Sequence, residues 1–549
     1  GSKVQQDTLY KENTVGSTLN AQNITITSGK DTTLQAANLK AQENIQVDAA
    51  GDINIVAKEY REGELHYTKK SDFGGLISSA SLDSTDALKL HEATLKTEAK
   101  NIIMNSGKDI TVVASNVSAG DALGLKAVQN VNVLSDEEQK SEQHYSKKSG
   151  LSLGFSDGML TVAEEKQTSD ANANITQKSS TLNAKTIVVE AGQDVSAIGS
   201  NLIASTIDVN AQRDVNILSA TESASHDHKE STAKAGIGVT LNMNEASIFA
   251  GVVTQSDKLG EGQTQEVSSQ LVGDNITVQS GNNTNILASN VIANNDVSIQ
   301  ADKNINILSE DATAYKNQVH EELKAGIKVG VQQHVTDAAK QLVSNAESLP
   351  KSDNAVNAAS TVLRSIDLVS NTLSHSVSAG FDAIAEMSKS DTSSQSTSAQ
   401  SSTIAAGHDV TLDASKEITV AGSDIIAGNK ISMNAETITL KSSGQNASSS
   451  SSEKSGSLKV TLFGTNEGQV DASYAQSRNR SNDTIQRDTY VAGNDVIINT
   501  SGDTTLQGAH VSGNTVTANV GGNLNLISVQ DTGSSKGDSE SIALSTGGS

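Results

Sequence analysis

The chain has 549 residues, a formal net charge of −24 and a sequence pI near 4.8, with one Pro, no Cys, no Trp and only 2% aromatic residues. This length exceeds one compact core and indicates several domains or one elongated array. The acidity argues against non-specific nucleic-acid binding, which needs stripes of Lys and Arg. The shortage of aromatic residues argues against an irregular globular core. The absence of an 18-residue apolar run argues against a transmembrane helix.

Residues 1–16 are expected to be a lead-in that begins with Gly-Ser cloning residues. Residues 17–311 then carry an internal repeat. The segments Asn23–Ile26 and Asn44–Val47 lie 21 residues apart, as do Asp31–Leu34 and Asp52–Ile55. Each segment alternates apolar and polar residues between Gly, Asn or Asp turns. The pattern predicts an all-β protein, a right-handed parallel β-helix with coils of about 20 residues. Six two-coil blocks give roughly twelve coils, a rod on the order of 60 Å long.

A polar residue recurs at one corner of each block, and Asn, Asp and His tolerate the left-handed backbone geometry of a sharp bend. We therefore predict a structural corner, although an Asn ladder that binds a ligand is an alternative. The corner residues are Asn38, Asn116, Asn201, Asn290, Asp424 and His510.

Longer segments interrupt the blocks, and all twelve aromatic residues are assigned to positions outside the coil strands. His66–Ser71 resembles His144–Ser149, and an alternating, Gly-rich run follows it. These runs predict β-hairpins that emerge from the β-helix. Their apolar face either folds back over the flank of the rod or contacts a membrane or a partner. The candidate contact residues are Tyr67, Phe73, Tyr145, Leu151, Leu153, Phe155, Ile237, Val239, Leu241, Phe249, Leu458, Val460, Leu462 and Phe463.

Residues 312–400 change to a helical period. One stripe contains Val335, Ala339, Leu342 and Ala346; a second contains Val356, Leu363, Ile366, Val369, Leu373, Val377, Ile384 and Met387. The pattern predicts a helical hairpin that turns near Pro350, followed by a Ser-rich linker from Ser388 to Ser402. Residues 401–549 are expected to continue the β-helix and to end within a further excursion.

The sequence lacks the signatures of catalysis. The recurring acids Asp31, Asp52, Asp109, Asp194 and Asp214 occur once per coil, which indicates turn chemistry rather than a convergent acid pair. Walker, Rossmann and calcium-nonapeptide motifs are absent. His226-Asp227-His228 lacks an apparent third metal ligand. We therefore expect no enzyme, no metal site and no cofactor; a polysaccharide lyase would need clustered carboxylates and aromatic sugar platforms, and no Trp is present to stack a sugar.

Blocks such as Ser28–Leu34 and Ala50–Ile55 resemble the filamentous-haemagglutinin repeats of two-partner-secreted exoproteins. The Tyr-x-Lys-Lys-Ser hairpins resemble those of the second repeat region of contact-dependent growth-inhibition proteins. The resemblance implies a secreted, cell-surface protein of a Gram-negative bacterium, exported through an outer-membrane secretion partner. It also implies that this region helps to move a C-terminal toxin across the outer membrane of a target cell, where the module would reach the outer membrane or periplasm.

Two functional hypotheses follow. In the first, the module is a non-enzymatic delivery element that contacts the target outer membrane or a surface receptor, next to neighbouring coils and the toxin domain. In the second, it is a passive shaft of an adhesin that presents other domains at a distance. Neither hypothesis includes nucleic acid as a partner.

Overall fold

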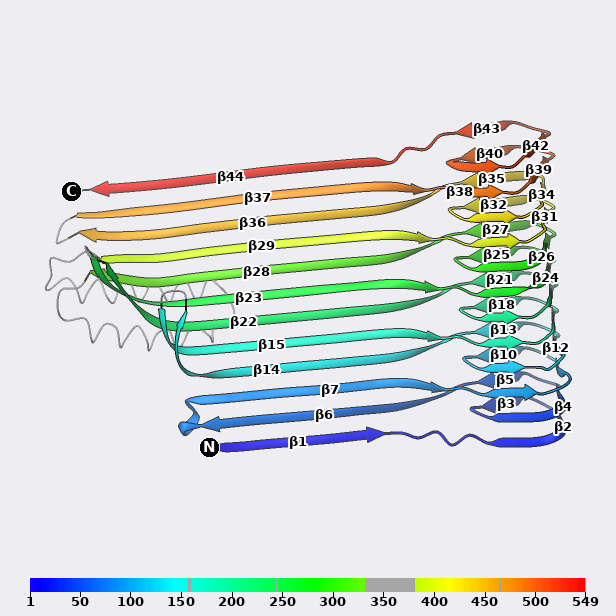
Figure 1. Cartoon of the computed structure of the whole chain (residues 1–549), viewed down its shortest axis with the longest axis horizontal. Coiled ribbons are helices and arrows are strands. Elements are labelled where there is room, and N and C mark those ends of the chain that lie inside the picture. The colour runs from blue at the N-terminus through cyan, green and yellow to red at the C-terminus, as the bar shows by residue number, and fades with distance from the viewer. Residues whose placement is uncertain (157–158, 243–244, 331–380, 464–466, 549) are drawn as a thin grey trace.

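The computed structural model describes residues 1–156, 159–242, 245–330, 381–463 and 467–548. Within them, a stack of parallel coils stands beside one long antiparallel sheet, and a 3-10 turn, η1 (Phe73–Gly75), joins two of the long strands. The coil stack occupies one side of Figure 1, and the long strands extend away from it. The predicted β-helix is thus confirmed as a parallel, all-β architecture, with hairpins added to it.

One wall of each coil is a short strand of a 12-stranded parallel sheet. Its strands are β3 (Thr32–Gln35), β5 (Ile53–Val56), β10 (Ile110–Val113), β13 (Val131–Leu134), β18 (Val195–Ile198), β21 (Val215–Leu218), β25 (Thr284–Leu287), β27 (Asn304–Leu308), β32 (Glu417–Ala421), β35 (Thr437–Lys441), β40 (Thr504–Gln507) and β43 (Leu524–Ile527). Twelve coils are therefore present among the described residues, as the repeat count predicts.

The remaining walls belong to a 20-stranded parallel sheet. Its strands are β2 (Thr18–Ser28), β4 (Asn38–Ala49), β8 (Thr94–Thr97), β9 (Ile102–Ser106), β11 (Asn116–Ser118), β12 (Ala122–Ala127), β16 (Thr181–Asn183), β17 (Thr186–Ala191), β19 (Asn201–Ile203), β20 (Thr206–Ala211), β24 (Gln270–Ser280), β26 (Asn290–Ala301), β30 (Thr403–Ala406), β31 (Asp409–Ala414), β33 (Asp424–Ala427), β34 (Lys430–Ala435), β38 (Thr489–Ala492), β39 (Asp495–Thr500), β41 (Ala509–Ser512) and β42 (Thr515–Val520).

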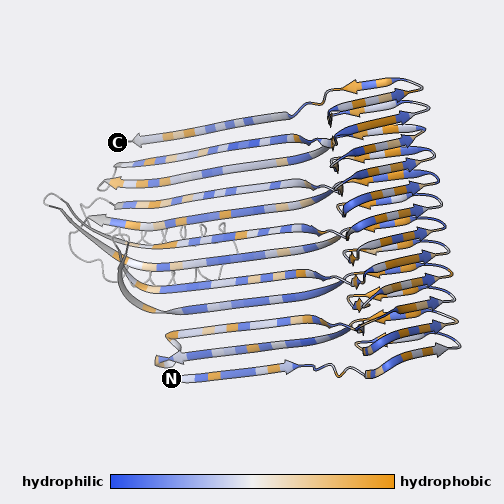
Figure 2. Ribbon diagram, turned by 45° about the vertical axis from the view of Figure 1, so that its right-hand side comes forward, coloured by the Kyte–Doolittle hydropathy of each residue, from blue (hydrophilic) through white to orange (hydrophobic). Residues whose placement is uncertain are grey.

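The core between these walls is a narrow column of aliphatic side chains. Successive coils place Ile110, Val131, Val195 and Val215 in direct register, and all four are buried. Small β-branched residues suit this column because their branched side chains pack well on a pleated surface and one coil supplies few atoms to each layer. Hydrophobic segments recur throughout the coil stack in Figure 2.

A ladder of turn acids and amides joins the coils. The Asp31 carboxylate accepts the backbone N–H of Asp52 at 2.8 Å, and the Asp52 carboxylate accepts that of Asp109 at 3.1 Å. Asp194 and Asp214 repeat the contact further along, at 3.1 Å between them. The interpretation of these acids as turn residues is confirmed.

The long strands form a 12-stranded antiparallel sheet, called the hairpin sheet below. Its strands are β1 (Ser2–Lys11), β6 (Lys58–Asp72), β7 (Ile77–His91), β14 (Asp136–Ser156), β15 (Met159–Lys178), β22 (Ala220–Asn242), β23 (Glu245–Val267), β28 (Glu310–Gly330), β29 (Phe381–Gln400), β36 (Ser443–Phe463), β37 (Glu467–Arg487) and β44 (Thr532–Gly548). Each pairs with the next, and no pairing joins the described strands of this sheet to the coil walls.

Two coils separate one hairpin from the next, and this spacing explains why the hairpins merge into one sheet. Parallel coils and antiparallel strands both repeat at about 4.8 Å, so two coils and one two-stranded hairpin have the same width, about 9.6 Å. Each hairpin therefore meets its neighbour edge to edge (Figure 1). The hairpins do not fold back over the flank of the rod, so that interpretation of them is wrong.

The segment predicted as a helical insertion differs where the structure describes it. Ala312–Gly330 belongs to β28, and Ile384 and Met387 lie on β29, so the helical interpretation is wrong at these positions. Ser388–Gln400, predicted as a linker, is also part of β29, and it pairs with β28 on one side and β36 on the other. The other residues of both helical stripes, and Pro350, lie outside the described residues.

Candidate interaction surface

The chain leaves the coil stack at one corner, where two kinds of connection alternate. After every second coil the corner carries a hairpin; after the coils between, it is closed by one residue with a left-handed backbone. That residue is Ala36, Ala114 or Ala288, with φ between 43° and 47°, or Gly199, Gly422 or Gly508, with φ between 55° and 60°. At Gly199 a Cβ would lie 2.5 Å from Ser135 Oγ and 2.8 Å from Ala220 Cβ, which belong to the bases of the hairpins on either side.

The predicted corner residues lie two positions after these left-handed residues. Asn38, Asn116, Asn201, Asn290 and Asp424 begin their coil strands, and His510 lies within β41. None has positive φ, so the left-handed geometry is assigned to the wrong residue in the sequence prediction. The bend needs a small side chain because hairpin bases crowd it, and Ala and Gly meet that need.

Sequence reasoning missed a buried ladder of hydroxyl groups at the same corner. Ser115, Ser180, Ser200, Ser269, Ser289, Ser402, Ser423 and Thr489 are all 0% exposed. The backbone N–H of Ser200 donates to Ser269 Oγ at 3.1 Å, and Ser269 Oγ donates to the Leu218 carbonyl at 2.7 Å. The ladder thus provides hydrogen-bond partners for backbone N–H and carbonyl groups at the corner of the coil stack. A Ser directly before β11, β16, β19, β24, β26, β30 and β33 was the available signal.

The hairpin sheet presents an apolar band on one face near the ends of its strands that lie away from the coils. Residues directly opposite in an antiparallel pair share a face. Register therefore places Ile237, Ala250, Ile327, Ala383, Val460 and Val470 in one row across six strands. The row nearer the coils contains Ala235, Val252, Ala325, Ala385, Leu458, Ala472 and Leu544, and the next contains Leu323, Met387, Tyr474 and Ile542. These three rows are called the apolar band below.

Exposure varies along this apolar band. Ala325, Ile327 and Ala383 are 2–6% exposed, whereas Met387 is 45%, Tyr474 38%, Ile542 52% and Leu544 65% exposed. The opposite face of the same strands is mainly glycine and polar residues: its row from β28 to β37 contains Gly326, Ile384, Lys459 and Asp471. Figure 2 shows hydrophobic segments recurring in the outer parts of the long strands. The band is therefore one-sided, and its exposed residues lie on β29, β37 and β44.

A charged row ends the apolar band on the side toward the coils. Lys389 Nζ donates to Glu321 Oε1 at 2.8 Å. This hydrogen bond lowers the pKa of Glu321 and raises that of Lys389, so both groups keep their charge. Nearer the coils, β29 and β36 carry mainly serine and threonine, so these strands have an apolar outer part and a polar inner part.

The structure places the predicted contact residues at different depths of the hairpin sheet. The face of the apolar band also contains Leu151, Ile237, Leu458 and Val460. Leu462 lies further out along β36, beyond the band, and is 38% exposed. Tyr67 and Tyr145 both oppose Leu82 in mid-sheet, and Phe73, 76% exposed, lies in η1. The side chains of Leu153, Phe155, Val239, Leu241, Phe249 and Phe463 lie outside the described part, although their residues belong to β14, β22, β23 and β36.

One aromatic residue departs from the prediction that all of them avoid the coil strands. Tyr490 lies on β38 and points outward, 45% exposed. Its ring stacks on His510 of the next coil, with 4.9 Å between ring centroids, and the Arg487 guanidinium lies 5.6 Å from the Tyr490 centroid. The coil core still excludes aromatic rings among the described residues, because this tyrosine belongs to the outer surface.

His–Asp pairs join neighbouring hairpins on the face opposite the apolar band. His66 Nδ1 lies 2.9 Å from Asp7 Oδ1, His228 Nδ1 2.5 Å from Asp170 Oδ1, and His320 Nδ1 2.5 Å from Asp257 Oδ1. His144 pairs with Asp83 in the same way. Register across the first five strand interfaces aligns six of these residues in a single row, Asp7, His66, Asp83, His144, Asp170 and His228. Each pair connects the outgoing strand of one hairpin to the returning strand before it.

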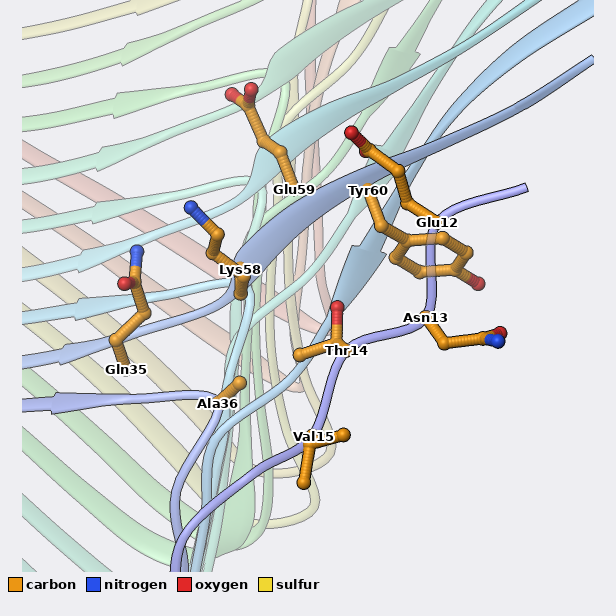
Figure 3. A pocket seen from close by; sticks show the side chains of 9 residues that line it. All are labelled: Glu12, Asn13, Thr14, Val15, Gln35, Ala36, Lys58, Glu59 and Tyr60. Atoms are coloured by element: carbon orange, nitrogen blue, oxygen red, sulfur yellow. The ribbon is translucent and has the colours of Figure 1, made fainter. Parts of the chain in front are cut away.

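Two further polar clusters of the described chain have local hydrogen-bond partners. His226, part of the His-Asp-His sequence, pairs with Asn172 at 2.6 Å, and no cluster of metal-binding side chains occurs among the described residues. A cleft of about 530 Å³ lies at the base of the first hairpin. In Figure 3 the Tyr60 ring lies on one side of it and Gln35 and Lys58 on the other. Its Glu12 carboxylate already accepts the Tyr10 hydroxyl and the backbone N–H of Arg61, and these bonds lower its pKa.

At a hairpin base, two carboxylates lie close to each other. Glu266 is 6% exposed and accepts hydrogen bonds from Ser219 at 2.7 Å and Thr221 at 2.9 Å. Burial and, secondarily, the charge of Glu266 raise the pKa of Glu310. The hydroxyl contacts assign Glu266 to the closure of the base of β22 and β23.

No helix of the described chain is long and apolar enough to cross a membrane.

The fold and this surface define a class: an elongated β-helix repeat protein whose regularly spaced hairpins form a separate sheet. The family model described as "Hemagglutinin repeat" matches residues 1–70, 77–211, 160–322, 251–374 and 383–542. The chain belongs to this haemagglutinin-repeat family. No solved structure matches it.

Curated relatives share the repeats within much longer proteins. The tRNA nuclease CdiA of Escherichia coli (strain STEC_O31) is 27% identical over 464 residues, 79% of this chain and 13% of that protein. The 16S rRNA endonuclease CdiA of Enterobacter cloacae is 26% identical over 368 residues, 61% of this chain and 10% of that protein. The Deoxyribonuclease CdiA of Dickeya dadantii is 25% identical over 401 residues, 69% of this chain and 12% of that protein. The chain thus spans about an eighth of the length of these relatives. The three relatives are named for three different nuclease activities.

Proposed function

We propose that this chain is a non-enzymatic delivery module that contacts the outer membrane of a target bacterium and helps a C-terminal toxin to cross it. The exposed, one-sided apolar band of the hairpin sheet carries the proposal. Shared repeats in relatives with different named nuclease activities support a role that is common to several toxins. The secretion partner, the toxin domain and the location at the target membrane are parts of this proposal.

The dimensions of the apolar band favour contact with one leaflet. From Leu323 to Ile327 the three rows cover four residue steps, about 14 Å at 3.4 Å per residue. The hydrocarbon core of a bilayer is about 30 Å thick, so this band reaches about half of it. Because the opposite face is polar, the sheet would lie with one face against lipid. The Glu321–Lys389 row would then mark the polar boundary, where charged groups remain hydrated.

Flotation of the purified chain with outer-membrane vesicles, followed by an alkaline wash and protease protection, tests the proposal. We expect stable, protected association with vesicles. The double substitution Met387→Asn and Leu544→Asn should reduce it at least tenfold, because both side chains are exposed in the band. Ile485→Asn is the matched control, since Ile485 is 53% exposed on β37 but lies near the coils.

Deletion of residues 150–162, which shortens the β14–β15 hairpin, should also reduce association. Complete recovery of the unmodified chain in the soluble fraction would contradict the delivery proposal. It would favour the passive adhesive shaft, for which the regular coil stack is suited.

A further inference from the structure

A groove of about 470 Å³ crosses the polar inner part of the hairpin sheet, between β28 and β37. Tyr315 and Asn317 line it from β28, Arg480 and Asn482 from β37, and serines of β29 and β36 form its floor. Register places Tyr315, Gln395, Ser448 and Asn482 in one row across the four strands. Three strand spacings separate its two sides, about 14 Å. The groove is therefore wide enough for a short chain of linked rings, and nothing assigned above uses it.

Tyr315 forms a flat platform at one side of the groove. A Cβ at the neighbouring Gly262 would lie 2.5 Å from Cε1 and 2.7 Å from Cζ of the Tyr315 ring. The ring therefore lies across the glycine backbone, and the side chain remains 44% exposed. An aromatic face has a negative quadrupole that attracts the weakly positive C–H groups of a ligand. Such a platform suits the apolar face of a sugar ring.

The other side of the groove carries a cation that lacks an ion-pair partner in the described chain. The neighbouring Lys536 lies opposite Arg480 and pairs with Asp538 at 3.6 Å, whereas no described carboxylate comes within ion-pair distance of Arg480. A guanidinium offers a planar fork that binds a carboxylate through two parallel hydrogen bonds.

Amides and hydroxyls fill the space between platform and cation. Asn317 and Asn482 supply donors and acceptors on opposite sides of the groove. The Ser393 and Ser450 hydroxyls, which hydrogen-bond to each other at 2.7 Å, also line the groove. This combination of aromatic face, amides, hydroxyls and one cation complements a polyhydroxylated ligand that carries a negative charge.

We propose that this groove binds a short acidic oligosaccharide, with one sugar ring on Tyr315 and a carboxylate at Arg480. The proposal goes beyond the delivery role and does not depend on it, since the groove lies inside the charged row that ends the apolar band. A uronic-acid oligomer in solution and the acidic sugar headgroup of a glycolipid share the required chemistry.

Isothermal titration of the full chain with a galacturonic acid tetrasaccharide tests the proposal, with neutral maltotetraose as the comparison ligand. We expect saturable binding of the acidic ligand that weakens with salt, and at least tenfold weaker binding by Tyr315→Ala and by Arg480→Gln. Tyr474→Ala and Arg478→Gln are the matched controls. Both residues lie on β37 and share the face of the groove but do not line it. Circular dichroism and melting curves establish that all four variants fold.

The two sources of the sugar are distinguished by sedimentation with vesicles that contain glucuronosyl diacylglycerol or, for comparison, phosphatidylglycerol. Recruitment to the glycolipid alone that is lost in Arg480→Gln would assign the ligand to a lipid headgroup. Binding of the tetrasaccharide without such recruitment would assign it to a free or polymeric sugar. The proposal is overturned if neither ligand binds, if maltotetraose binds equally well, or if Tyr315→Ala and Arg480→Gln bind like the controls.

Discussion

Removing one hydroxyl from the buried corner ladder tests whether that ladder stabilises the coil stack. Ser269 Oγ accepts the backbone N–H of Ser200 at 3.1 Å and donates to the Leu218 carbonyl at 2.7 Å. Ser269 is 0% exposed, so water cannot replace it without rearrangement. In Ser269→Ala the Ser200 N–H loses its partner inside the protein.

The expected loss of unfolding free energy is about 1–3 kcal/mol, the cost of one buried donor without a partner. Little cavity energy is added, because a single oxygen atom is removed. Urea unfolding followed by circular dichroism measures the change, with the midpoint as the main quantity because long repeat arrays depart from two-state behaviour. Ser298→Ala, on the outward face of β26, is the control and should change stability by less than about 0.5 kcal/mol.

Equal midpoints for Ser269→Ala and Ser298→Ala would refute the reasoning. Such a result would mean that the corner relaxes enough for the Ser200 N–H to find another acceptor. Amide hydrogen exchange at Ser200 provides a local readout, since exchange should accelerate in Ser269→Ala if the hydroxyl is the acceptor that protects this N–H.

Three further predictions follow from the hairpins and coils. The Asp7 carboxylate raises the pKa of His66, and the same contact lowers the pKa of Asp7. The pair therefore stabilises the folded protein most between the two ordinary pKa values. This stabilisation is lost as pH rises through the pKa of His66 or falls through that of Asp7. NMR titration should find a lower His66 pKa in Asp7→Asn, and an unchanged value would contradict the pairing. Ile307→Ala should cost about 2–5 kcal/mol in urea unfolding because Ile307 is 0% exposed, whereas the 38% exposed Ile292→Ala should cost much less; similar losses would argue against the coil core. Gly199→Val should lower stability by more than about 2 kcal/mol, since a β-branched residue is forced to a φ of 56° beside two hairpin bases, and wild-type thermal stability would show that the corner can open.

The coil strands could be predicted from the sequence because their information is local. Segments such as Asp52–Ile55 and Asp109–Val112 alternate with period two and stand next to turn acids, so neither pairing partner has to be known. The acid ladder was predictable for the same reason. The left-handed residue was assigned wrongly because Ala at such a position gives no sequence signal, while the Asn two residues later does.

The hairpin sheet could not be predicted in the same way, because it depends on how far apart the hairpins leave the stack. Ser388–Gln400 has the composition of a linker, and its own β-propensity is weak. It is a strand because β28 and β36 satisfy its backbone on both sides. Ile384 and Met387 matched a helical stripe, yet Ala383, Ala385 and Met387 alternate on one strand face. Alanine fits both periods, so the residues alone did not distinguish them.

The apolar band was partly predictable, since Leu151, Ile237, Leu458 and Val460 were all found by their alternation. The Tyr315 groove was not, because Tyr315 and Arg480 are 165 residues apart in the chain, and their approach depends on the register of three strand interfaces. Local patterns therefore identify surfaces within one hairpin, and register is needed for surfaces that several hairpins build.

The equal widths of two coils and one hairpin also restrict how such a protein can change length over generations. A duplication or loss of a whole block, two coils with their hairpin, leaves both the coil stack and the hairpin sheet continuous. Gain of a single coil would keep the stack intact but displace the neighbouring hairpins by about 4.8 Å, one strand width, and open a seam in the sheet. Genes for these arrays should therefore grow and shrink by whole blocks, and lengths that correspond to an odd number of coils between hairpins should be rare among them.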